Sequence, residues 1–235
     1  MKPILLIAVC FFSSGVCFSQ TAETFFDRGM EKGERGDCHG AIADYTKAIK
    51  LKPYYAMAYH RRGLEKYRLK DYSGAIADYT KAIELQPNVA NGYGARGLAK
   101  AKVKDHRGAI VDFTRAIELG PDDADAYGNR GLAKENLEDH RGAIADYTKA
   151  IELKPDYVGA YFLRGFVKVV LKDSSGAIAD YTKAIELKPN GADAYGARGI
   201  LRLQAGDKVN GCADLKKASD LGSAMALKAY RSFCK

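Results

Sequence analysis

Apolar residues recur along this chain with a helical spacing, and the whole pattern repeats every 34 residues. The segment GAIADYTKAI begins at Gly40 and recurs at Gly74, Gly142 and Gly176, with the variant GAIVDFTRAI at Gly108. Apolar positions three and four residues apart are typical of an amphipathic α-helix. Self-similarity at a fixed period of this length indicates repeated units that stack on their neighbours.

Extending this register divides the chain into six units, each with two helical stretches separated by a turn. The turn contains a recurring Asp, such as Asp71, and Asp is a favourable helix N-cap. A proline such as Pro87 ends the second helix of units one to five, because proline cannot continue a hydrogen-bonded turn. The sequence therefore predicts an all-α superhelix, or solenoid, of six helical hairpins. The units are residues 22–55, 56–89, 90–123, 124–157, 158–191 and 192–222.

Small and aromatic residues occupy fixed places within each unit. The first helix carries an aromatic residue followed by Gly, as in Tyr59 and Gly63, and the second carries Ala75 and Tyr79. With the period and the closing proline, this arrangement resembles the tetratricopeptide repeat over residues 22–222. The resemblance implies that the first helices line a concave face, which holds peptides, helices or folded partners.

Two charged columns depart from the usual pattern of that repeat. Arg precedes the Gly of every first helix, where the common repeat has Leu, and Asp precedes the aromatic residue of the second helix. Guanidinium can bind carboxylate through two parallel hydrogen bonds. We therefore expect each Arg to pair with the Asp of its own or a neighbouring hairpin, as a structural ladder; an anion-binding stripe is the alternative. The ladder residues in units two to five are Arg62, Asp78, Arg96, Asp112, Arg130, Asp146, Arg164 and Asp180.

The concave face implied by the resemblance is the expected place for a partner. In the fifth unit its helix is apolar nearly all round, a pattern that normally means burial on both sides. Stacking buries only one side, so we expect an exposed apolar contact patch lined by Phe162 and Phe166. The alternative is that these rings fill space left by the small residues Gly128 and Gly196 in the adjacent units. The full set of expected groove residues is Leu64, Leu98, Asn129, Leu132, Phe162, Phe166 and Ile200.

The last residues, 223–235, are predicted to form a capping helix, because a solenoid needs a cover over its final apolar face. Met225, Leu227 and Tyr230 are the residues expected to cover that face. A cap of this kind would fold back antiparallel to the second helix of the sixth unit.

Cysteine positions agree with this hairpin. Cys212 lies ten residues before Gly222 and Cys234 lies twelve residues after it, so the two come level in an antiparallel pair. In an oxidising compartment this predicts a disulfide, with two free buried thiols as the alternative. Cys38 is left over, as a free thiol or an intermolecular handle.

Residues 1–19 have the features of a signal peptide. Lys2 precedes a short apolar stretch, and a small-x-small signal ends at Ser19, where cleavage is expected. The stretch is too short for a membrane span, and Val rather than a small residue precedes Cys10 and Cys17. We therefore expect a secreted or periplasmic protein with no membrane insertion after signal removal; a retained or lipid-anchored form is the less favoured alternative.

Composition and motifs offer little chemistry. The net charge of +8, or +7 without Lys2, is spread along the repeats, so we expect no nucleic-acid partner. His106 and His140 lie on adjacent hairpins, too far apart to share zinc, and no phosphate loop or catalytic motif is present. We expect no cofactor, no metal site and no enzyme activity. The sequence favours a protein–protein interaction scaffold that binds a protein or peptide, with a self-assembling structural subunit of an envelope complex as the alternative.

Overall fold

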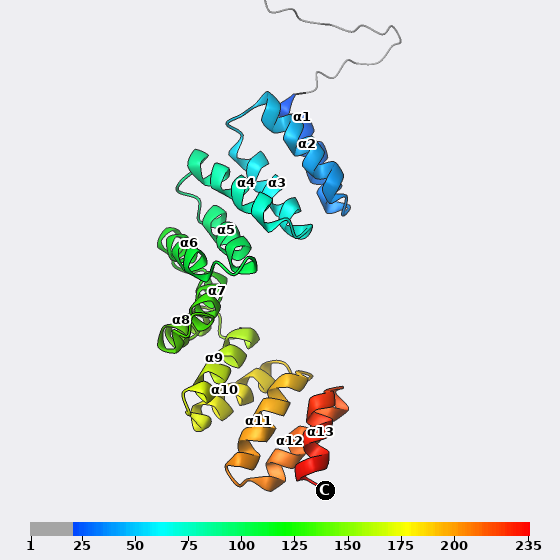
Figure 1. The fold of residues 1–235 in the computed structure, drawn as a ribbon, viewed down its shortest axis with the longest axis vertical. Helices are drawn as coiled ribbons and strands as arrows, with labels where there is room; N and C mark the ends of the chain where they lie inside the picture. Colours follow the sequence, from blue (N-terminus) through cyan, green and yellow to red (C-terminus); the bar gives the residue numbers. More distant parts are fainter. Residues whose placement is uncertain (1–20) are drawn as a thin grey trace, which may run out of the picture.

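In this computed structural model of the protein the described residues are 21–235, so the expected signal peptide lies outside them. The described chain forms thirteen α-helices and no strand. Consecutive helices pair as antiparallel hairpins, and the hairpins stack into an open arc with α6 and α8 on its outer side (Figure 1). The helices are α1 (Ala22–Glu34), α2 (Cys38–Leu51), α3 (Ala56–Arg68), α4 (Tyr72–Leu85), α5 (Ala90–Lys102), α6 (His106–Leu119), α7 (Ala124–Glu135), α8 (His140–Leu153), α9 (Val158–Val170), α10 (Ser174–Leu187), α11 (Ala192–Gln204), α12 (Lys208–Asp220) and α13 (Ala224–Phe233).

The recurring Asp begins the second helix of every hairpin. In α6, for example, the Asp105 side chain accepts a hydrogen bond from the backbone N–H of Gly108. This bond satisfies one of the orphan amides of the first helical turn. The residue directly before each of these Asp residues has a positive φ. In four hairpins this residue is not glycine but Lys70, Lys104, Glu138 or Lys172.

Each hairpin closes around the aromatic residue of its second helix. Phe113 of α6 is 1% exposed, and a Cβ added at Gly97 of α5 would come 2.9 Å from its Cε1 atom. The next hairpin adds a residue such as Ala133 of α7 to the same cluster. The core is therefore a series of small clusters joined hairpin to hairpin, as expected for a solenoid.

The last helix, α13, covers α12 with a different set of residues from the one predicted. Ala226 is 3% exposed and packs with Ala229 and Tyr230 against Leu215. Met225 is 84% exposed, so its predicted covering role is wrong. The contact face is formed by residues three and four apart, and Met225 lies one residue outside that phase.

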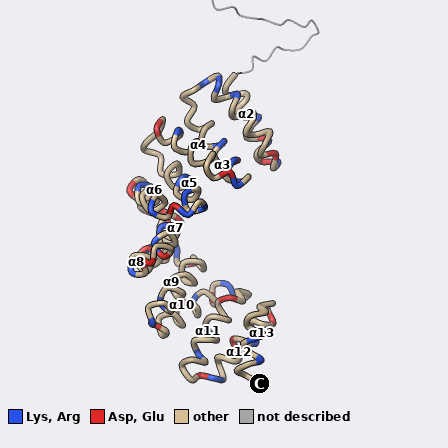
Figure 2. The backbone as a smooth tube through the Cα atoms, viewed as in Figure 1, with Lys and Arg blue, Asp and Glu red and all other residues tan. Residues whose placement is uncertain are grey.

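Charge is distributed along the whole array. Lys, Arg, Asp and Glu appear on most of the labelled helices in Figure 2. No helix of the described chain is long and apolar enough to cross a membrane.

Candidate functional site

The Arg and Asp columns form a ladder between helices. Arg62 donates to Asp78 of its own hairpin from Nε at 2.8 Å and from Nη2 at 2.6 Å. Its third nitrogen, Nη1, donates to the hydroxyl of Thr46 in the preceding hairpin at 3.0 Å. Lys66 adds a second cation, 2.8 Å from Asp78, and the Arg62 guanidinium lies over the Tyr59 ring at 5.5 Å. One arginine thus ties three helices together.

The same geometry recurs through the central hairpins. In each of the next three rungs an Arg Nη2 lies 2.7 Å from an Asp oxygen, and the Asp side chains are almost fully buried. Hydrogen bonds to the carboxylate raise the pKa of Arg96 and Arg130, so these side chains stay charged. This arrangement supports a structural ladder over an anion-binding stripe. The rungs are Arg96–Asp112–Thr80, Arg130–Asp146–Thr114 and Arg164–Asp180–Thr148.

The two ends of the ladder differ from its middle. At the start, Arg28 pairs with Asp44 and holds the pKa of that carboxyl at about 2, but no hairpin precedes it within the described residues. At the other end the place of the accepting Thr is taken by Lys216, which pairs with Asp220 at 3.0 Å. The ladder therefore offers no acceptor to a further hairpin beyond α12.

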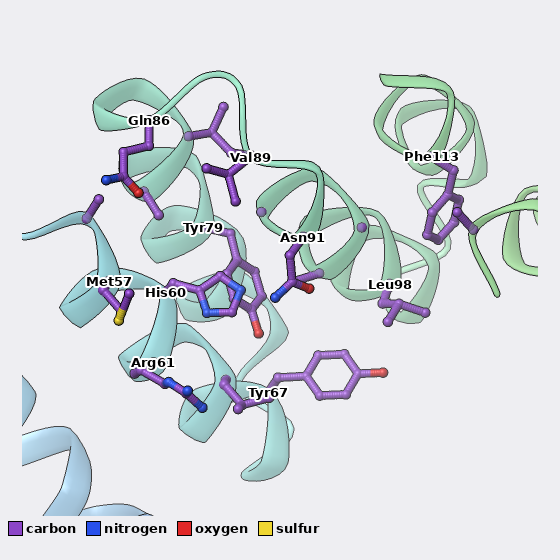
Figure 3. A pocket seen from close by; sticks show the side chains of 18 of the residues that line it. Met57, His60, Arg61, Tyr67, Tyr79, Gln86, Val89, Asn91, Leu98 and Phe113 are labelled. Atoms are coloured by element: carbon purple, nitrogen blue, oxygen red, sulfur yellow. The ribbon is translucent and has the colours of Figure 1, made fainter. Parts of the chain in front are cut away.

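A cavity of about 560 Å³ opens on the first helices of hairpins two to four. Three of the expected groove residues, Leu64, Leu98 and Asn129, line it. Figure 3 shows Leu98 beside the cavity with His60 and Asn91, which come from neighbouring first helices. This volume lies within the usual range for ligand sites of 300–1,000 Å³.

The cavity exists because the side chain at one position of the repeat is large in some hairpins and absent in another. In hairpins one, two and five, a ring from the first helix lies on the aromatic ring of the second, with centroids 5.4–5.6 Å apart. These rings are Phe26, His60 and Phe162. In hairpin three the same place is Gly94, and a Cβ added there would meet nothing within 4 Å. Gly94 therefore leaves space over α5 that a side chain fills elsewhere.

Polar groups surround the apolar floor of the cavity. Arg61 from α3 and Asp123 and Asp125 from the start of α7 contribute charges. The His60 ring packs on Tyr79, and its Nε2 is buried without a hydrogen-bond partner; burial lowers the pKa of His60, with Arg61 adding to the effect. The wall beside α3 therefore carries its positive charge on Arg61.

The other expected groove residues lie outside this cavity. Phe166 is 47% exposed and Leu132 is 40% exposed, so they form an apolar surface over α7 and α9. Ile200 is partly buried and packs against the cluster beneath α13. Phe162 is partly buried and packs against residues of α10 and α11, with its centroid 5.5 Å from that of Tyr181. In hairpin five this ring occupies the position that carries no side chain at Gly94 in hairpin three.

Sequence reasoning missed His60, Arg61, Phe113 and Asp125 as cavity residues. The signal was present in the alignment of the units, where His60 and Gly94 occupy the same position. The core could be predicted from positions that are the same in every unit. The cavity depends on a position that differs between units, such as His60 and Gly94.

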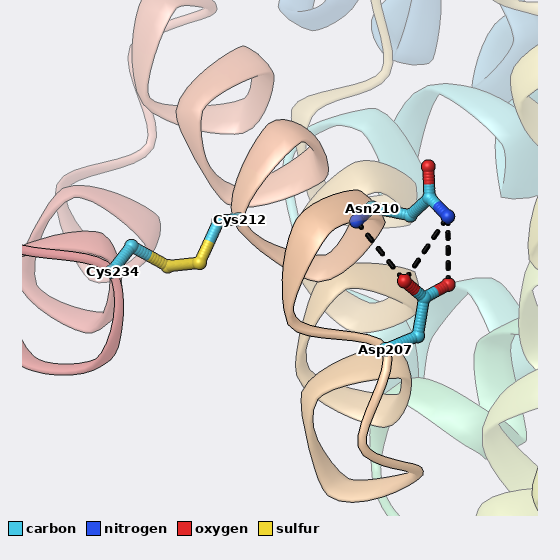
Figure 4. The surroundings of a disulfide bond; sticks show 4 residues. All are labelled: Asp207, Asn210, Cys212 and Cys234. Carbon is cyan, nitrogen blue, oxygen red and sulfur yellow. Dashed lines mark hydrogen bonds between the residues drawn. A yellow bond between two sulfur atoms is a disulfide. The ribbon is translucent and has the colours of Figure 1, made fainter.

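The structure joins Cys212 of α12 to Cys234 after α13 in a disulfide, with Cα atoms 5.6 Å apart (Figure 4). Cys38 remains free, and its thiol lies against the buried Glu65 carboxylate, which raises the pKa of Cys38 together with burial. Arg68 pairs with the same carboxylate at 3.0 Å. The thiol is therefore held in its protonated form within the joint between hairpins one and two. Among residues 21–235, no group of three or more potential metal ligands is gathered.

Comparison with known proteins agrees with this architecture. Family models described as tetratricopeptide repeat match residues 56–89, 124–157 and 158–190. The chain is a tetratricopeptide repeat protein, and its fold is the all-α superhelix of that family. No curated protein is similar enough to this chain to count as a relative.

Several solved structures share the fold. MamA protein is 29% identical, with a TM-score of 0.69, and the match covers 74% of this chain and 95% of MamA. YrrB, described as a tetratricopeptide protein with an unusual peptide-binding site, is 24% identical over 80% of this chain and 97% of YrrB, with a TM-score of 0.67. PilF of Pseudomonas aeruginosa is 15% identical, with a TM-score of 0.76, covering 90% and 96% of the two chains. The latter two likenesses concern the fold alone.

Proposed function

We propose that this protein is an interaction scaffold that holds a segment of a partner protein in its concave groove. Tetratricopeptide repeat proteins bind protein or peptide partners. The observation that supports binding in the groove is the cavity over hairpins two to four, where Gly94 leaves Leu64 and Leu98 accessible. A concave site with an apolar floor and a few polar groups is the usual form of a binding site.

The self-assembly alternative has less support. End-to-end stacking would need a further hairpin to continue the ladder, yet Lys216 stands where Thr would accept the next arginine. Helix α13 also covers α12 and is joined to it by the disulfide. Both features fit an array that ends at α13.

Photocrosslinking in the native cell tests the scaffold function. A benzophenone amino acid is placed at Met57, which lines the cavity and is 54% exposed, or at Val111 on α6, which is 67% exposed. We expect adducts with a discrete protein from position 57 and none from 111. Gly94→Leu, which fills the cavity, should remove these adducts. Equal adducts from both positions, or adducts that survive Gly94→Leu, would refute groove binding.

We also propose that the protein acts outside the cytoplasm, after removal of residues 1–19. The support is the charged start, apolar stretch and small-x-small signal ending at Ser19. Mass analysis of the native protein should find an N-terminus at Gln20 in the extracytoplasmic fraction. Intact Met1 in the cytoplasmic fraction would refute this location.

A further inference from the structure

The cavity over hairpins two to four carries opposite charges at its two ends. Arg61 contributes a cation from α3, and Asp123 and Asp125 contribute anions from α7. None of these three side chains takes part in an ion pair among the described residues. The neighbouring Arg62, by contrast, is fully engaged in the ladder. Asp123 Oδ1 accepts the backbone N–H groups of Asp125 and Ala126 as the N-cap of α7, and Asp125 lies beside the Tyr157 hydroxyl. Neither carboxylate is neutralised by a paired cation in the described chain, so these charges and that of Arg61 can still attract a ligand.

Apolar surface lies between the two charged ends. Leu64 of α3 and Leu98 of α5 line the cavity, and Phe113 contributes from behind α5. Packed helices lie about 8–10 Å apart, so two such intervals separate α3 from α7 by about 16–20 Å. An extended chain rises about 3.3–3.6 Å per residue and would cross this distance in about five or six residues.

The distance between the two charged walls favours an extended ligand. A helix rises only 1.5 Å per residue, so it would need about eleven to thirteen residues to reach from one wall to the other. An extended segment meets both walls with about half that number.

We propose that the groove recognises an extended segment of a partner protein with an acidic residue, an apolar residue and a basic residue in that spatial order. The acidic side chain lies against Arg61, the apolar one on Leu64 and Leu98, and the basic one against Asp123 and Asp125. This inference rests on the proposed scaffold function. Complementary charges at the two ends fix the direction in which the segment lies, because the reversed segment would bring like charges together.

Selection from a random 12-residue peptide library displayed on phage, panned on the purified protein, tests the proposal. We expect the enriched peptides to carry an acidic and a basic residue about four to six positions apart, with an apolar residue between. A synthetic peptide of the enriched sequence should bind about tenfold or more weakly to Arg61→Glu and to Asp125→Lys, because each change places like charges together. Lys149→Glu, an equal charge change at an exposed site on α8, is the control and should leave the affinity unchanged.

A charge-swapped peptide completes the design. The double variant Arg61→Glu, Asp125→Lys should bind the swapped peptide better than the original, which a general loss of structure would not produce. Peptides that bind in a Gly94→Leu-sensitive manner without this charge pattern would overturn the charge recognition and leave the scaffold function standing. Failure to enrich any peptide whose binding Gly94→Leu abolishes would overturn both. Dimerisation in sedimentation velocity that Gly94→Leu abolishes would show that the groove holds a second copy of the chain, and would also overturn the proposal.

Discussion

Arg130 and Asp146 lie 16 residues apart in the chain and are joined by two parallel hydrogen bonds, from Nε at 2.9 Å and from Nη2 at 2.7 Å. Asp146 is 4% exposed, so this pair is largely removed from water. The remaining nitrogen of Arg130 donates to Thr114 of the preceding hairpin at 3.1 Å. A single side chain therefore connects α7 to α8 and to α6.

Arg130→Ala should destabilise the protein markedly. The substitution leaves the buried Asp146 with Lys134 as its remaining cation and leaves Thr114 without its donor. Breaking a buried pair costs about 3–5 kcal/mol, and the remaining Lys134 should reduce the loss to about 2–3 kcal/mol. Chemical denaturation measures this loss.

Lys149→Ala is the matched control for that experiment. Lys149 is 46% exposed, and its one ion pair within residues 21–235 is with Glu152, three residues along α8. An exposed pair of this kind contributes about 0.5 kcal/mol or less. Equal, small effects of the two substitutions would show that the arginines are free and would favour the anion-binding stripe.

Recurrence in the sequence was enough to predict the Arg–Asp pairing, because every Arg has an Asp at a constant distance in the chain. It was not enough to choose between the same and the neighbouring hairpin, since helix packing decides that. The Thr acceptor was missed, although Thr46 and its equivalents recur in the segment GAIADYTKAI. Its hydroxyl becomes relevant only once the preceding hairpin is stacked beside the arginine.

The groove shows the opposite limit of sequence reasoning. The apolar column that includes Leu64 and Leu98 could be predicted from the repeat, but the cavity between them could not. It depends on whether the neighbouring column carries a ring, as at His60, or no side chain, as at Gly94. The partial burial of Phe162 could not be predicted for the same reason, because it depends on how the ring packs against Tyr181 and the neighbouring helix α11.

Lys104→Gly should stabilise the protein. Lys104 has a φ of 64° in the turn before α6, a conformation that is unfavourable for residues with a Cβ. Glycine relieves this strain but is more flexible in the unfolded chain, so we expect a net gain of about 0.5–1 kcal/mol. The control, Lys81→Gly at an exposed position inside helix α4, should lose about 0.5–1 kcal/mol instead. A loss of stability for Lys104→Gly would mean that this turn relaxes to a different conformation.

Reducing the disulfide should loosen the C-terminal cap without unfolding the array. Cys212 and Cys234 are 22 residues apart in the sequence. A disulfide that closes a loop of this length stabilises the folded state by about 3 kcal/mol. Because contacts in a solenoid are made between neighbours, the effect should stay local. Hydrogen exchange should accelerate in α13 and α12 after reduction and remain unchanged in α3 to α6. Uniform acceleration along the chain would contradict local capping.

Phe162→Ala and Phe166→Ala should differ in their effect on stability. Phe162 packs against Tyr181 and against the cluster that includes Ile185, so its truncation should cost about 2–4 kcal/mol. Phe166 is 47% exposed and should cost less than about 1 kcal/mol. The two phenylalanines lie four residues apart on α9, which makes each the control for the other. A large loss for Phe166→Ala would show that its ring is part of the core.

Two glycines of helix α5 give the sharpest test of the cavity. Gly94 and Gly97 lie three residues apart, and an added Cβ would meet nothing within 4 Å at Gly94 but would come 2.9 Å from Phe113 at Gly97. Gly94→Ala should raise the free energy of unfolding by about 0.5–1 kcal/mol, because alanine is the better helix former. Gly97→Ala should lower it by about 1–3 kcal/mol, because the methyl group overpacks against the ring. Thermal and urea unfolding of the two variants measures both signs, and a destabilised Gly94→Ala variant would mean that the space over α5 is already filled.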